Sequence, residues 1–230
     1  MSRLAFELER LYRGPDRSPD TLRGLVLALA RPADWDAVLR VWQGVQADLG
    51  LPAPAIAVNG VDGYQLWFAW AQPVPKEEAQ AWLMAVVHHY LPEVEAHRLA
   101  VTEVEAQTVP ALEAASGRWS AFVTADLARV FADEPGLDFA PNPDAQAELL
   151  SRLSPMPLAD VRLSLARLAP PPPPAVSAPI TQAAPVAARG PADLATDQGP
   201  RGFLLAVMQH PEVDLALRID AAKALLGAAD

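Results

Sequence analysis

Apolar and polar positions along the first part of this chain fall into patterns that differ from segment to segment. Leu4, Leu8 and Leu11 recur at helical spacing, which predicts a short amphipathic helix before Gly14-Pro15. The run 22–30 is almost continuously apolar and too short for a clear helix signal. We therefore expect a central strand over 22–30, buried on both faces of a sheet.

The stretch 55–71 is the most informative pattern of the chain. An apolar segment over 55–58 meets a two-glycine turn over 59–63, and an aromatic-rich segment over 64–71 follows without a gap. This arrangement predicts a β-hairpin.

Capping residues and periodicity predict the remaining elements. Prolines open two helices, and Thr124 and Asn142 are expected to cap two shorter ones. The predicted helices are 33–49, 75–90, 125–131 and 143–153, and the additional strands are 95–103 and 118–123. This order predicts an α+β or mixed α/β layer fold, with a largely antiparallel sheet packed by helices.

Composition shifts sharply after the first 168 residues, where five consecutive prolines begin at Pro170. We predict a domain over 1–168, a Pro/Ala-rich linker over 169–201 and a helical hairpin over 202–230. Short helices of this kind are marginal alone, so their apolar side chains need a partner. Docking on the same chain and docking on another protein both remain open. The residues expected to make that contact are Phe203, Val207, Leu215, Ile219 and Leu226.

Composition limits the chemistry. The chain has no cysteine and four histidines, which excludes thiolate zinc sites and a cysteine nucleophile. Its net charge is −10, which opposes non-specific nucleic-acid binding. Acids at Glu7 and Glu9 lie where a signal peptide would be apolar, and no run is long enough to span a membrane. We expect a cytoplasmic protein that does not bind membranes.

The segment 59–67, Asn-Gly-Val-Asp-Gly-Tyr-Gln-Leu-Trp, follows a strand, a helix and a second strand. Over roughly residues 21–131 this order resembles the nucleotide-binding core of archaeo-eukaryotic-type primases, including end-joining ligase polymerase domains and plasmid or phage primases. The resemblance implies a nucleotide site at Asn59, Gly60, Gly63 and Gln65. The family has Ser or Thr at the position of Asn59 and a phosphate-contacting histidine at that of Gln65.

The same resemblance implies metal-binding carboxylates at the end of the first strand and after a later one. The first strand here ends without a carboxylate, and Asp34, Asp36 and Asp126 are the nearest candidates. Each also has an ordinary explanation, because acids in the first turn of a helix complement its dipole. We therefore expect no catalytic residue, no metal and no cofactor, with Mg²⁺ or Mn²⁺ needed only if the three aspartates form an enzyme site.

Six tryptophans allow two interpretations: a platform on which single-stranded DNA bases stack, or ordinary core packing, which the pattern favours. The resulting hypothesis is a non-catalytic primase-like domain in DNA replication or mobile-element biology, with a partner-binding tail. Single-stranded DNA or a nucleotide stays open as a ligand. The alternatives are a pure protein-interaction adaptor and a metal-dependent nucleotide-binding enzyme.

Overall fold

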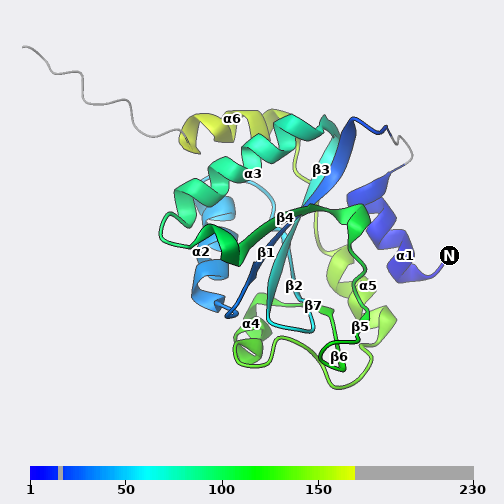
Figure 1. Cartoon of the computed structure of the whole chain (residues 1–230). Helices are drawn as coiled ribbons and strands as arrows, with labels where there is room; N and C mark the ends of the chain where they lie inside the picture. Colours follow the sequence, from blue (N-terminus) through cyan, green and yellow to red (C-terminus); the bar gives the residue numbers. More distant parts are fainter. Residues whose placement is uncertain (15–17, 169–230) are drawn as a thin grey trace, which may run out of the picture. The chain divides into compact units, whose positions relative to one another are not determined.

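A five-stranded antiparallel sheet with helices on both faces forms the centre of the domain in the computed structural model (Figure 1). The structure describes residues 1–14 and 18–168. The predicted linker and the tail with Phe203, Val207, Leu215, Ile219 and Leu226 lie outside the described residues. Within the described ranges, no helix combines the length and the apolar character that crossing a membrane requires.

Periodicity and caps place most elements where the sequence predicts them. The helices are α1 (Arg3–Leu8), α2 (Trp35–Ala47), α3 (Lys76–Tyr90), α4 (Ala125–Ala128), α5 (Pro143–Ser151) and α6 (Leu158–Leu168). The strands are β1 (Thr21–Ala30), β2 (Ala55–Val58), β3 (Gly63–Pro75), β4 (Leu99–Glu103), β5 (Leu112–Glu113), β6 (Arg118–Trp119) and β7 (Ala121–Val123). A π-helical turn over Glu9–Arg13 extends α1, so the predicted N-terminal helix changes its winding partway.

The strand order of the main sheet is β4-β1-β3-β2-β7, and every neighbouring pair is antiparallel. From β1 to β4 the chain follows the βαββαβ order of a split βαβ, or ferredoxin-like, unit. The α+β prediction is thus confirmed. The strand over 22–30 and the hairpin around Asn59 lie in one sheet.

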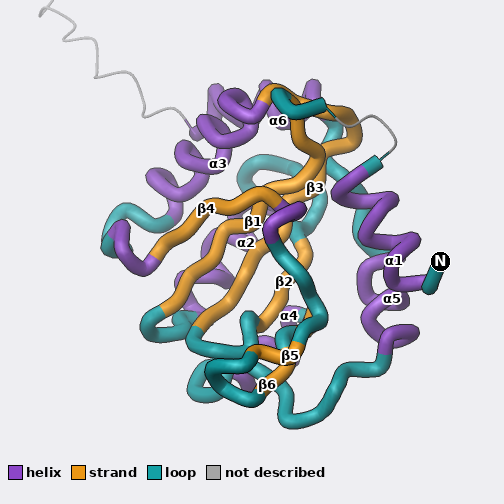
Figure 2. Tube along the Cα trace, turned by 45° about the vertical axis from the view of Figure 1, so that its right-hand side comes forward, coloured by secondary structure: helices purple, strands orange, loops and turns teal. Residues whose placement is uncertain are grey.

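Helices α2 and α3 cover one face of this sheet (Figures 1 and 2). Alternate residues of β3, including Phe68 and Trp70, point into this layer and are fully buried. Trp82 of α3 packs edge-on against both rings, with centroid distances of 5.4 Å and 5.7 Å. Its indole N–H donates to the Ser164 hydroxyl of α6 at 2.9 Å, and this hydrogen bond joins α6 to α3.

Helices α1 and α5 cover the other face (Figure 2). Trp67 points into this layer, opposite to Phe68, and its ring lies edge-on to Tyr12 at 5.4 Å and to Phe122 at 5.1 Å. All three of these rings are buried. Leu27 of β1 is buried in the layer of α2 and α3, and Val26 is buried in the layer of α1 and α5. The prediction that this strand is buried on both faces is confirmed.

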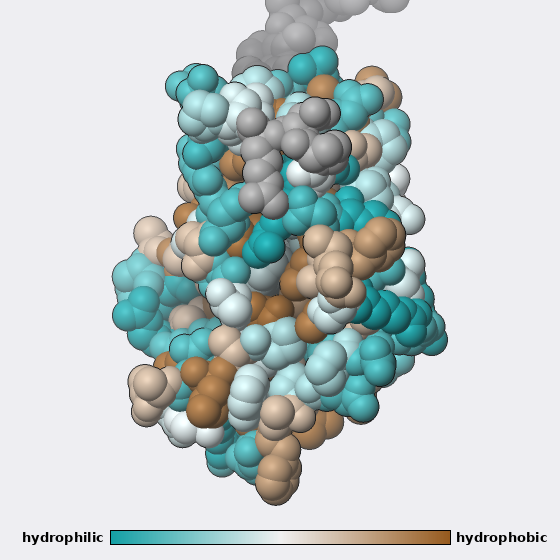
Figure 3. Space-filling view, turned by 90° about the vertical axis from the view of Figure 1, so that its right-hand side faces the viewer, coloured by the Kyte–Doolittle hydropathy of each residue, from teal (hydrophilic) through white to brown (hydrophobic). Residues whose placement is uncertain are grey.

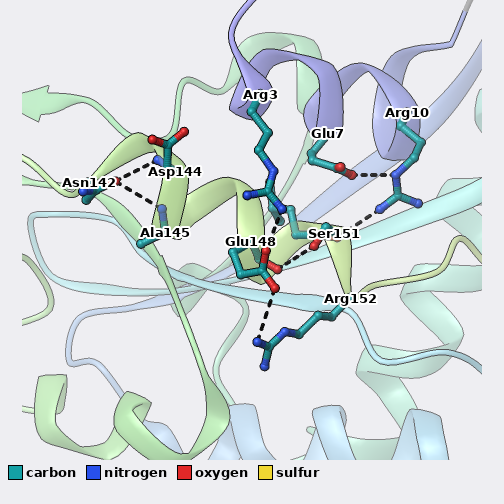
Figure 4. A network of polar contacts seen from close by, with 10 residues as sticks. Arg3, Glu7, Arg10, Asn142, Asp144, Ala145, Glu148, Ser151 and Arg152 are labelled. Carbon is teal, nitrogen blue, oxygen red and sulfur yellow. Dashed lines mark hydrogen bonds and ion pairs between the residues drawn. The ribbon is translucent and has the colours of Figure 1, made fainter.

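Polar contacts fasten α1 to α5 (Figure 4). Arg3 pairs with Glu148 at 2.6 Å, and Glu148 also meets Arg152 at 3.4 Å. Arg10, held by Glu7 at 2.6 Å, donates to the carbonyl oxygens at the end of α5, Leu150 at 3.0 Å and Leu153 at 3.1 Å. These last bonds join the turn after α1 to the last turn of α5 and to the residues just beyond it.

The predicted strand over 118–123 is wrong as one element, because it breaks at Ser120. Residues before the break pair with β5, and residues after it pair with β2. The Ser120 hydroxyl accepts from Ala111 N at 2.9 Å, and Ser120 N donates to Ala111 O at 2.8 Å. Ala111 directly precedes β5, so these bonds continue the pairing of β5 with β6 by one residue. The next residue, Ala121, pairs with β2 in the main sheet.

Other boundaries also differ. The predicted strand over 95–103 starts only at Leu99, because Arg98 N donates to Glu95 O at 2.9 Å and closes a 3₁₀ turn. The Thr124 side chain does not cap α4, although its carbonyl accepts from Ala128 N at 3.0 Å. Helix α6 was not predicted.

Candidate functional site

The turn between β2 and β3 is organised around Asn59. The side-chain oxygen of Asn59 accepts hydrogen bonds from the amides of Val61, Asp62 and Gly63, at 2.9, 2.9 and 3.0 Å. Its amide nitrogen donates to the Asp62 carboxylate at 2.9 Å. Asparagine commonly stabilises turns by such bonds to the backbone that follows it. Asn59 is therefore a structural residue of the turn, with its hydrogen-bonding groups directed at its own segment.

Gly60 explains why the turn offers no cradle for a phosphate. Its backbone has φ +78°, and its N–H donates to Pro135 O at 2.7 Å. The Ser116 hydroxyl donates to its carbonyl. A Cβ on Gly60 would lie 2.8 Å from Glu113 and 3.0 Å from the amide nitrogen of Ser120, so neighbouring segments press directly on the turn.

All four amides over 60–63 consequently donate within the protein: one to Pro135 and three to Asn59. Phosphate-binding loops work through free backbone N–H groups that converge on the anion. The second glycine, Gly63, lies against β1, where an added Cβ would come within 2.3 Å of Leu29 O. The two glycines of the motif thus permit close packing of the chain against itself.

Gln65, at the position where the resembled family has histidine, lies in the core layer beneath α1 and α5. It is 7% exposed. Its oxygen accepts from the Trp67 indole N–H at 3.0 Å, and its nitrogen donates to the Gln107 side chain at 3.3 Å. Gln65 therefore provides the hydrogen-bond acceptor for a buried indole, which is a structural role.

Two of the candidate aspartates lie beside a hollow of about 300 Å³ at the end of β1. Asp34 caps α2 by accepting from Ala37 N at 3.0 Å, and Asp36 is exposed in the first turn. Arg98 and Arg129 line the same hollow, and Arg98 lies 3.5 Å from the Asp34 carboxylate. Two guanidinium groups oppose the binding of a divalent cation there.

Asp126 does not join this pair. It lies in the first turn of α4, is exposed, and is absent from the lining of the hollow. In the ranges 1–14 and 18–168, no three His, Asp or Glu residues are grouped as a metal site would need. The structure thus places Asp34 and Asp36 together and leaves Asp126 outside their hollow.

Four of the six tryptophans are buried: Trp35, Trp67, Trp70 and Trp82. Trp42 is half-buried and donates its indole N–H to Pro54 O at 3.1 Å. RNA-recognition sheets bind bases on an open face carrying aromatic residues. Here the corresponding face is closed by α1 and α5, whose outer side is largely hydrophilic with smaller apolar patches (Figure 3).

Two larger hollows have apolar linings. One, of about 350 Å³, lies between α2, β2 and α5 and includes Trp42, Pro54 and Leu149. The other, also about 350 Å³, lies between α3 and β4 and includes Met84, Leu99 and Val101. Neither is lined by residues 59–65, so neither belongs to the site that the motif predicts.

Sequence reasoning missed the segments that close the turn. They come from 111–120 and 135–137, more than fifty positions further along the chain. The sequence does show a glycine at one of the contact points, Gly136, where a Cβ would come within 2.9 Å of Gly60 Cα.

No known protein-family model matches this chain, and a search of curated proteins finds no match either.

Proposed function

We propose that this chain is a non-catalytic protein-interaction adaptor, built on a sheet whose order is that expected of a primase-like core. The observation that carries the proposal is the use of every amide in the turn 60–63 by Asn59 and Pro135. A turn whose backbone N–H groups are all hydrogen-bonded within the protein has no free donor for a triphosphate. Gln65, bonded to Trp67 in the core, supports the same conclusion.

Charge favours protein over nucleic acid as the partner. The chain carries a net charge of −10, and nucleic-acid binding draws much of its free energy from cation–phosphate contacts. The buried Trp67, Tyr12 and Phe122 leave no stacked aromatic platform on the sheet.

A second candidate function is a non-catalytic primase-like domain that binds single-stranded DNA in replication or mobile-element biology. The observation that favours it is topological: β1 and the hairpin around Asn59 share one sheet. Shared architecture does not transfer function, so this candidate needs a binding result of its own.

Fluorescence anisotropy separates the two candidates. The full chain is titrated against a labelled single-stranded oligonucleotide of mixed sequence at about 50 and 200 mM salt. An adaptor gives no salt-sensitive binding. Binding that weakens steeply with salt would overturn the adaptor proposal in favour of the second candidate. Templated nucleotide incorporation with Mg²⁺ or Mn²⁺, abolished by Asp34→Ala, would overturn both.

A further inference from the structure

The two edge strands of the sheet, β7 and β4, differ in how the backbone groups on their outer sides are hydrogen-bonded. At the β7 edge, the Gln146 side chain accepts from Phe122 N at 2.7 Å and donates to Phe122 O at 2.9 Å. At the opposite edge, β4 pairs with β1 on one side only. Among the described residues, Leu99 N donates to Ala96 O in the preceding 3₁₀ turn, and no strand other than β1 pairs with the rest of β4. Unpaired edges of this kind are templates for another strand.

An apolar groove runs along this free edge. Its floor includes Leu99 and Val101 of β4, and its wall includes Met84 and Val87 of α3. Leu99 and Val101 are two residues apart, so they lie on the same side of β4, next to α3. Met84 is 54% exposed, an unusual environment for a large apolar side chain. A strand added beside β4 would place alternate side chains in this groove.

The rim of the groove is acidic. Glu93 and Glu95 are exposed and alternate with the lining residues Pro92, Val94 and Ala96. Glu105, just beyond β4, is exposed as well. Within the part of the chain that the structure describes, no ion pair to Lys or Arg is made by any of these three carboxylates, although His97 lies 3.2 Å from Glu95.

His88 belongs to the lining of the groove, whereas the nearby lysine and arginine side chains are engaged elsewhere or lie outside it. Lys76 pairs with Glu103 at 2.7 Å, and Arg98 donates to Pro32 O at 3.0 Å, over the end of β1. Arg40 lies with Glu93 in the adjacent hollow on the other side of Pro92. The apolar floor and acidic rim therefore complement a segment that is apolar on one side and basic on the other.

We propose that the β4 edge binds an extended peptide segment of a partner protein, in which apolar residues alternate with lysine or arginine. The segment adds a sixth strand to the sheet through main-chain hydrogen bonds, the mode known as β-augmentation. Its apolar residues enter the groove between Met84 and Val101. Its lysine or arginine residues lie on the other face of the added strand and are attracted by the exposed carboxylates of Glu93, Glu95 and Glu105 that flank β4. This inference rests on the adaptor function proposed above and names its surface.

The test uses the full chain and two labelled peptides of about ten residues, one alternating valine with lysine and the other valine with glutamate. We expect the lysine peptide to bind, more weakly as salt rises, and the glutamate peptide not to bind. Met84→Glu and the double variant Glu93→Lys/Glu95→Lys should each weaken the lysine peptide by about tenfold or more. Hydrogen exchange of the 99–103 amides should slow on binding.

Matched controls are Leu163→Glu and Asp20→Lys, which make the same kinds of change at exposed positions away from the groove. Both should bind like the unchanged chain. Absence of binding to the lysine peptide, or equal loss in the controls, would overturn the inference. So would a dimer in sedimentation that Met84→Glu dissociates, because a second copy would then occupy the edge. None of these results alters the oligonucleotide test, so the two proposals fail separately.

Discussion

The side-chain amide of Gln146 bonds to both backbone groups of Phe122, at 2.7 and 2.9 Å, and so takes the place of a neighbouring strand. The register explains this geometry. Phe122 lies opposite Ala57, between residues that pair with β2 on either side, and its own N–H and C=O point outward. Gln146 of α5 therefore occupies the backbone groups of β7 with which a further strand would pair.

Removal of this amide should be costly. Gln146→Leu leaves a buried donor and acceptor unpaired, and we expect a loss of about 2–4 kcal/mol in the free energy of unfolding. Urea denaturation measures it. The matched control is Gln46→Leu, since Gln46 donates at 2.7 Å only to the Trp42 carbonyl on its own helix. The control should change stability by less than about 0.5 kcal/mol. Equal effects in both variants would contradict the strand-like role.

Substitutions at two glycines can distinguish the energetic cost of backbone strain from that of steric overpacking. Gly60 and Gly117 have similar positive φ angles, +78° and +70°, but an added Cβ meets close neighbours only at Gly60. Gly117→Ala should cost about 1–2 kcal/mol from strain alone. Gly60→Ala should cost about 1–3 kcal/mol more, from overpacking against Glu113 and Ser120. Thermal or urea unfolding measures both. If the two variants are equally stable, the turn is more open than its contacts indicate.

The aspartates at the start of α2 are expected to act on stability alone. Asp34→Ala removes the helix cap and should cost about 0.5–2 kcal/mol. Asp36→Ala should cost only a few tenths, because it loses just a favourable position near the helix dipole. Calorimetric titration with Mg²⁺ or Mn²⁺ should give no binding heat for any of the three proteins. Metal binding that Asp34→Ala abolishes would support the enzyme alternative instead.

The tyrosines should resist ionisation. Burial raises the pKa of Tyr64 and of Tyr90 to about 12, with Asp133 and Asp48 adding to the respective shifts, and burial also raises the pKa of Tyr12. A pKa raised by folding gives stability that is complete below the unfolded pKa, near 10, and is lost as pH rises toward the folded value.

Absorbance at 295 nm should therefore show little phenolate in the folded chain up to about pH 11, and a midpoint near pH 10 in denaturant. The free energy of unfolding should fall from about pH 10 upward. A folded-state titration that matches the denatured one would show that these rings are accessible.

Local patterns were enough to predict much of the fold. The apolar run of β1, the hairpin around Asn59 and the helix before Gly50 all lie where the sequence places them. These elements are long, or they are bounded by strong turn and cap residues. Helix α6 was missed, although Leu158, Val161, Leu165 and Leu168 recur at helical spacing.

The candidate site was predicted only in its outline. The pattern located the turn. Whether its backbone groups are free to bind a ligand depends on Pro135, Gly136 and Ser116, which lie far along the chain and contact Gly60. No local spacing reveals such contacts. In the same way, a glutamine following a turn gives no sign that its partner will be the indole of Trp67.

The ion pair between Arg3 and Glu148 joins residues 145 positions apart, so the first helix of the domain packs against one of its last elements. The layer around Trp67 includes Leu150 of α5, so it cannot close before α5 has docked. Contacts between residues this far apart in the sequence form slowly, because the long loop between them must first lose conformational entropy. An N-terminal fusion partner would therefore lie beside the part of the domain that is completed last.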